Sequence, residues 1–289
     1  MTDAPPNPGS LPGSPPESPL GPAADTVLAV LQDPVGAAPC LQVAAAAARA
    51  LAQPEVRALH VRCDPAATLM ASEEVLPEER RQALAAKADT DAAAIHAAFL
   101  AWRSPSLPSR WEQVDGVPAE IVAARATAAL VVMMSLPRAH APLTDRAALD
   151  AALFSPGRPV LVVPTGWTDG FGRHLAVGWR DTPSTRQALR TARPWLSRAE
   201  SVTVISVGPD APAWPDPGLI GAPAARVSFR AIDPNGRGEG ESLLSAVAEV
   251  GADGLVMGAY RRSQVMEWIL GGVTRYCLHA ATIPLLMVH

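Results

Sequence analysis

Short apolar runs alternate with longer stretches of helical pattern along most of the chain. The runs are rich in Val, Ile and Leu and are bounded by turn residues, as is typical of strands buried on both faces of a sheet. In the first half the predicted strands are 26–31, 56–63, 111–117, 129–134 and 159–164. In the second half they are 175–179, 201–208, 226–232, 255–258 and 285–289.

The stretches between these runs predict helices. They cover 39–53, 73–102, 118–127 and 145–154, and then 184–196, 241–250 and 274–281. Residues 165–173 form a glycine-containing linker, and 209–222 form a loop. Strands that alternate with helices pair in parallel through right-handed crossovers, with helices on both faces of the sheet. The pattern therefore predicts an α/β fold.

The two halves of the chain resemble each other. The run 27–33 aligns with 175–181, and 159–164 aligns with 284–289. Repetition at this scale indicates two similar structural units in one chain. We therefore predict tandem α/β domains at 25–165 and 173–289, after a disordered tail, 1–24, that is rich in Pro, Gly and Ser.

Composition narrows the possible functions. The net charge of −4 and the lack of a Lys/Arg block argue against nucleic acid as a partner. The apolar run 126–136 is too short to span a bilayer, and the N-terminus shows no secretory pattern. The three cysteines lie far apart, as expected of reduced thiols. These features predict a cytoplasmic protein that interacts with neither membranes nor nucleic acid.

A candidate anion site lies near the C-terminus. Gly258 closes a predicted strand, and the pair Gly271 and Gly272 opens the following helix. Because the first N–H groups of a helix have no partner within the helix, they favour a phosphate or carboxylate. The residues alone therefore predict a phosphate or nucleotide site, although Gly258 would also suit a tight turn with positive φ and the glycine pair a flexible loop.

This C-terminal segment resembles the signature of the universal stress protein family. In nucleotide-binding members the pattern is Gly, two residues, Gly, nine residues, Gly, then Ser or Thr. Gly258 and Gly271 hold the first and third glycine positions, while Arg261 and Gly272 replace the second glycine and the hydroxyl residue. The pattern then continues, as the family has it, with Val273 and Thr274.

The resemblance implies both a fold and a function. It implies two doubly wound, Rossmann-like sheets of strand order 3-2-1-4-5, which pair through their last strands as an intrachain pseudo-dimer. It further implies a stress-response regulatory protein that binds ATP, together with Mg²⁺, in its second unit. Homodimers of the whole chain are also expected.

The resemblance assigns two more residues to the nucleotide site. Family members that hold ATP carry an aspartate in the turn after the first strand. Aligned through Thr182 and Pro183, that position is Arg180, with Asp181 one place later. Asp181 either accepts a hydrogen bond from the ribose or adenine, or caps the next helix together with Thr182 and Ser184. Arg261 either clamps phosphate or fills the space that a glycine would leave open.

The first unit lacks these features. Met134 aligns with Gly258, Gln32 takes the position of the first-turn acid, and no glycine pair precedes Pro159. We therefore expect the first unit to have lost its site and to act as a packing partner.

Residues suited to catalysis are scarce. The six histidines have no metal-ligand spacing, and no side chain is an evident general base for a bound phosphate. We therefore expect neither a metal site nor an enzyme. One alternative is a nucleotide-free interaction module whose cleft is filled by Arg180 and Arg261. Another, from a different class, is a nucleotide hydrolase.

Overall fold

The computed structural model describes residues 26–52, 54–63, 77–138, 141–155, 158–208, 213–259 and 272–289. The predicted tail, 1–24, lies outside the described residues, as do Arg261, Gly271 and the first residues of the helix predicted at 73–102.

The strands form one continuous ten-stranded sheet of order β3-β2-β1-β4-β5-β10-β9-β6-β7-β8. Each half of the chain contributes five parallel strands in the order 3-2-1-4-5, which confirms the predicted repeat. The first half supplies β1 (Thr26–Val30), β2 (Glu55–Arg62), β3 (Ser109–Asp115), β4 (Val131–Ser135) and β5 (Val160–Val163). The second supplies β6 (His174–Gly178), β7 (Ser201–Val207), β8 (Val227–Ile232), β9 (Gly254–Gly258) and β10 (Leu285–Val288).

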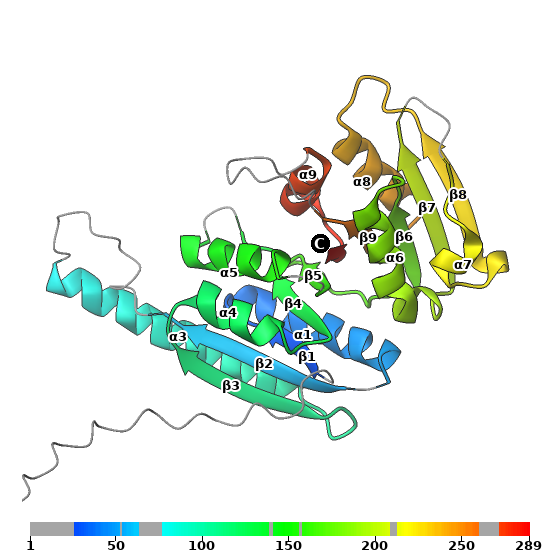
Figure 1. Cartoon of the computed structure of the whole chain (residues 1–289). Helices are drawn as coiled ribbons and strands as arrows, with labels where there is room; N and C mark the ends of the chain where they lie inside the picture. The colour runs from blue at the N-terminus through cyan, green and yellow to red at the C-terminus, as the bar shows by residue number, and fades with distance from the viewer. Residues whose placement is uncertain are drawn as a thin grey trace, which may run out of the picture.

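Helices cover both faces of this sheet, and each face has its own apolar core (Figure 1). One core is packed by α1 (Pro34–Ala50), α3 (Glu78–Trp102) and α6 (Pro183–Leu196). The other is packed by α4 (Pro118–Ala126), α5 (Leu143–Leu153), α8 (Glu239–Glu249) and α9 (Gly272–Ala280). Because each core contains side chains from both halves, the two units share their interior. Among the described helices, none has the length and apolar character needed to cross a membrane.

The two units meet along their last strands. β5 and β10 are antiparallel, with Leu286 opposite Leu161, and both side chains are fully buried. On one face the junction is reinforced by the Trp195 indole N–H on α6, which donates to the Ala47 carbonyl oxygen on α1 at 3.2 Å. The predicted pseudo-dimer is therefore joined edge to edge into a single sheet, which removes two apolar strand edges from solvent.

Two local predictions were wrong. The helix predicted at 39–53 begins at Pro34, because Asp33 caps it by accepting from the Val35 N–H at 3.2 Å. Proline favours the first helical turn, so Pro39 suggested a start although it lies inside α1. The loop predicted at 209–222 contains a short helix, α7 (Pro217–Ile220).

Candidate functional site

The turn between β6 and α6 lies at the carboxyl end of the second unit's parallel strands, where ligands bind in doubly wound folds. Thr182 caps α6, because its hydroxyl oxygen accepts from the Thr185 N–H at 3.2 Å. Asp181 instead binds Arg186 in a bidentate ion pair, at 2.5 and 2.7 Å. The alternative that Asp181 is a helix cap was therefore wrong, and the Arg186 guanidinium lowers the pKa of its carboxyl.

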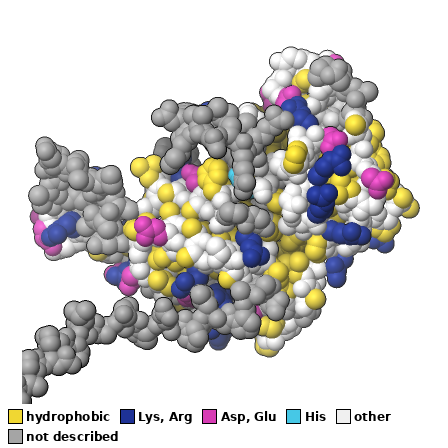
Figure 2. Space-filling model, viewed as in Figure 1, with side chains coloured by type: hydrophobic (Ala, Val, Ile, Leu, Met, Phe, Trp, Pro, Cys, Tyr) yellow, Lys and Arg dark blue, Asp and Glu magenta, His cyan; other side chains and the backbone are white. Residues whose placement is uncertain are grey.

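Arg180, in the same turn, points to the neighbouring helix. Its Nη2 donates to Glu239 Oε1 at 2.7 Å, at the start of α8. Both side chains are exposed, so the ion pair contributes little to the stability of the fold, but it fixes the direction of the guanidinium. Figure 2 shows acidic and basic side chains lying close together on this face of the second unit.

Gly258 owes its lack of a side chain to close packing. A Cβ at this position would lie 2.8 Å from the Thr185 nitrogen and 2.9 Å from the Ser184 carbonyl carbon, both backbone atoms of α6. Its φ is not positive, so the interpretation based on turn conformation was wrong. The close approach brings the end of β9 against the first turn of α6.

The first turn of α9 supplies the remaining described residues of the site, namely Gly272, Val273 and Thr274. Because β9 and β10 are parallel, the helix that connects them begins at the carboxyl edge of the sheet. This turn contains no acidic residue, so nothing in it offsets the partial positive charge of the helix start. Thr274 is buried, whereas a Cβ on Gly272 would meet no atom of the described residues within 4 Å.

The predicted site residues thus fall into three groups. Gly258 packs against α6, and Gly272, Val273 and Thr274 form the helix start at the same edge of the sheet. Arg180 and Asp181 are engaged by other side chains. The remaining two, Arg261 and Gly271, lie outside the described residues.

In the first unit the strand register corrects the alignment by one residue. Val30 pairs with Met134, as Gly178 pairs with Met257, so the counterpart of Gly258 is Ser135 rather than Met134. In the first unit the glycine of this strand–helix contact is Gly36 on α1, where an added Cβ would come 2.2 Å from Ser135 Oγ. The glycine thus lies on the helix in the first unit and on the strand, as Gly258, in the second.

Gln32 has a structural role in the first unit. Its side-chain amide donates to the Val61 carbonyl oxygen at 3.2 Å and accepts from the Val61 N–H at 3.0 Å. It therefore extends the pairing of β1 with β2 beyond the last strand residue, and both of its polar atoms are engaged there.

The sequence prediction missed a cavity of about 410 Å³ at the carboxyl edge of β1 and β4. Asp33 and Arg138 form an ion pair of 2.9 Å there, and Lys87 pairs with Asp91. Burial, and after it the charge of Asp33, raises the pKa of Asp145 to about 6. The charged residues come from four separate segments, so no local pattern marked them. Because carboxylates outnumber cations in this lining, it disfavours a polyphosphate.

Asp145 is expected to make stability depend on pH. As the pH rises from about 4 to about 6, the unfolded state loses this proton before the folded state does, so ionisation of Asp145 progressively destabilises the fold. Asp145→Asn should therefore raise the unfolding free energy at neutral pH by roughly 1–2 kcal/mol, after allowance for partial exposure. Urea denaturation at about pH 4 and pH 7.5 measures this, and the gain should vanish at the lower pH.

The control for this prediction is Asp169→Asn, which changes an exposed carboxylate in the linker. It should leave both unfolding free energies unchanged within experimental error. A gain in Asp145→Asn that is equal at the two pH values would contradict the assigned pKa.

Among the described residues, no three His, Cys, Asp or Glu side chains are grouped so that they could hold a metal ion. His60 is buried and bonded through Nδ1 to the Leu31 carbonyl oxygen at 2.7 Å, and burial lowers its pKa. Its contacts are those of a core residue.

Comparison with known proteins finds a family match in the last part of the chain. Residues 236–289, from the start of α8 through β10, match the model of the universal stress protein family. These residues are similar to that family. The chain also has the fold of universal stress proteins along nearly its whole described length, as two solved structures show. Comparison with curated proteins gives no match.

The first of these structures is a universal stress protein from Archaeoglobus fulgidus DSM 4304. It superposes with a TM-score of 0.64 at 13% identity, over 91% of this chain and 98% of that one. The second is a provisionally assigned universal stress protein from Pseudomonas aeruginosa UCBPP-PA14, with a TM-score of 0.52, 14% identity and 93% coverage of both chains. At these identities the likeness establishes the shared universal stress protein fold. Both neighbours align with the two units together, so the tandem arrangement occurs in these structures as well.

Proposed function

We propose that this chain is a cytoplasmic stress-response regulatory protein whose second unit binds ATP, with Mg²⁺ accompanying the phosphates. The phosphates would lie against the N–H groups of Gly272, Val273 and Thr274 at the start of α9. Gly271 and Arg261 complete the loop in the sequence pattern. We also propose that the chain forms homodimers and that a protein partner binds its ATP-bound form.

The observation that carries this proposal is the position and charge of the first turn of α9. It lies at the carboxyl edge where the strand order reverses between β6 and β9, which is where doubly wound folds place ligands. It contains no carboxylate, and it falls within the segment that matches the universal stress protein family. The corresponding cavity of the first unit is lined by three aspartates, which makes the second unit the better phosphate site.

Binding would act as a signal and not as turnover. Two described carboxylates near this edge, those of Asp181 and Glu239, are both held in ion pairs with arginines. A carboxylate that is held as an ion by a guanidinium is a poor general base for activating water. Occupancy by ATP would instead be the state that a protein partner recognises.

Isothermal titration with Mg·ATP tests the proposal, with substitutions at Gly272. Because a Cβ there meets no atom of the described residues within 4 Å, Gly272→Asp should fold normally, while its carboxylate at the helix start repels phosphate. We expect Gly272→Asp to weaken binding by about tenfold or more, the equivalent of 1.4 kcal/mol. Gly272→Ala, the matched control, should bind like the unmodified chain.

One alternative has support from the geometry, namely a nucleotide-free interaction module. The Arg180 guanidinium is already bonded to Glu239, and Gly258 is explained by packing without any ligand. In this alternative the second unit acts only through a protein partner. The absence of heat and of a thermal shift at millimolar Mg·ATP would favour it and would overturn the nucleotide proposal.

A further inference from the structure

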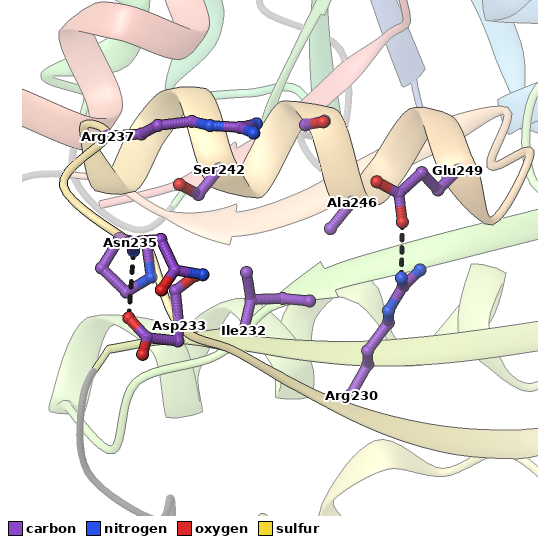
Figure 3. A pocket seen from close by; sticks show the side chains of 10 residues that line it. Arg230, Ile232, Asp233, Asn235, Arg237, Ser242, Ala246 and Glu249 are labelled. Carbon is purple, nitrogen blue, oxygen red and sulfur yellow. Dashed lines mark hydrogen bonds and ion pairs between the residues drawn. The ribbon is translucent and has the colours of Figure 1, made fainter.

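A second, smaller pocket lies on the outer edge of the second unit, between α8 and the edge strand β8 (Figure 3). It has a volume of about 130 Å³. In the sheet order, β8 is separated from β6 by β7, so this pocket is distinct from the β6–β9 edge proposed for nucleotide. Its lining is largely polar and includes Arg230, Asp233, Asn235, Arg237, Ser242 and Glu249.

Ser242 points to a missing partner in this pocket. The residue is only 5% exposed, and its Oγ makes no hydrogen bond to any described residue. A serine inside a helix often bonds back to the carbonyl four residues earlier, but here the Gly238 carbonyl oxygen accepts only from the Ser242 N–H, at 3.0 Å. Figure 3 shows the hydroxyl on the side of α8 that faces the turn bearing Asp233 and Asn235. Since buried polar groups are nearly always hydrogen-bonded, a molecule in the pocket is the natural partner.

The charges of the lining restrict what that molecule is. Arg230 and Glu249 form an ion pair across the pocket (Figure 3). Arg237 and Asp233 make no ion pair with other described residues, although Asp233 Oδ1 accepts the Asn235 N–H at 3.0 Å. One guanidinium and one carboxylate thus remain for a ligand. A polyphosphate would meet two carboxylates and a divalent cation two guanidinium groups, whereas a zwitterion can satisfy both residual charges.

The size of the pocket restricts the ligand further. Its volume of about 130 Å³ is well below the roughly 300–1,000 Å³ of pockets that take drug-sized ligands. We therefore expect a ligand of the size of glycine or alanine rather than a nucleotide or an aromatic amino acid.

We propose that this pocket binds a small α-amino acid as its zwitterion. Ser242 Oγ–H donates to the ligand carboxylate. The exposed side chains of Arg237 and Asp233, which Figure 3 draws on either side of Ser242, turn toward the ligand, where the guanidinium donates to its carboxylate and the Asp233 carboxylate accepts from its ammonium. The small volume favours a short side chain. The site is independent of nucleotide binding in the second unit, and it gives the protein a second small molecule to which it responds.

Thermal unfolding of the full chain with millimolar glycine or L-alanine tests the proposal. Both should raise Tm in a concentration-dependent way, because a ligand that binds only the folded state stabilises it. Acetate, ethylamine and L-tryptophan at the same concentrations should not raise Tm. Acetate lacks the ammonium group, ethylamine lacks the carboxylate, and L-tryptophan has a large side chain. No shift with glycine and alanine, or an equal shift with acetate alone, would overturn the proposal.

Substitutions make the test specific. Ser242→Ala should weaken binding of glycine by about tenfold or more, and should leave Tm of the ligand-free protein unchanged or raised, because it removes a buried hydroxyl that lacks a partner. Arg237→Gln should weaken binding similarly, while Arg190→Gln, on the exposed face of α6, should not. Undiminished binding in Ser242→Ala would show that the hydroxyl does not contact the ligand. A lower ligand-free Tm would show that it has a structural partner, and either result refutes the site.

Discussion

Leu286→Ala should lower the free energy of unfolding of this protein by about 2–5 kcal/mol, the largest effect that we expect from a single side-chain truncation here. Leu286 is fully buried in β10, opposite Leu161 of β5, at the point where the two units join. Truncation removes apolar contacts and leaves a cavity in a strand that pairs on both sides, so relaxation is limited. Urea denaturation followed by circular dichroism measures the loss.

The matched control is Leu100→Ala on α3, where the leucine side chain is 46% exposed. Its effect should remain within about 0.5 kcal/mol. A loss below about 1 kcal/mol in Leu286→Ala would contradict the continuous ten-stranded sheet, because a leucine at a solvated strand edge costs little to truncate. Separate unfolding transitions for the two halves would contradict the shared cores described above.

Gly258→Ala should destabilise the protein by about 1–3 kcal/mol through steric overlap alone. The added methyl group would lie within 3 Å of two backbone atoms of α6, at Ser184 and Thr185, and backbone cannot rotate away as a side chain can. Either β9 or the start of α6 must therefore shift. Chemical denaturation without any nucleotide measures the effect, which makes the result independent of ligand binding.

Gly272→Ala is the control, because its added methyl group contacts none of the residues that the structure describes. Alanine in a helix is favoured over glycine by roughly 0.5–1 kcal/mol, so this substitution should be neutral or stabilising. If Gly258→Ala were equally harmless while abolishing nucleotide binding, the glycine would have to be explained by a ligand and not by packing.

The candidate site was predictable only in part. The spacing of Gly258, Gly272 and Thr274 pointed to one edge of the sheet as the candidate site, because strand ends and helix starts leave local patterns in a sequence. The sequence did not reveal that Asp181 bonds Arg186, or that Ser135 takes the place of Gly258 in the first unit. Side-chain pairing and strand register depend on how the elements pack, and several alternative pairings differ little in free energy.

What the sequence by itself determined is the repeated α/β order, and the resemblance to universal stress proteins added the pairing of the two halves through their last strands. Alternating buried strands and helices leave few chain-compatible arrangements, and the apolar edges of β5 and β10 require a cover. Only the tertiary structure determined where pockets lie and which charged side chains line them. The acidic cavity around Asp145 is built from segments far apart in the chain, whereas the pocket beneath Ser242 lies within residues 230–249, between β8 and α8. Both exist only after folding, because the packing of these elements brings the side chains together.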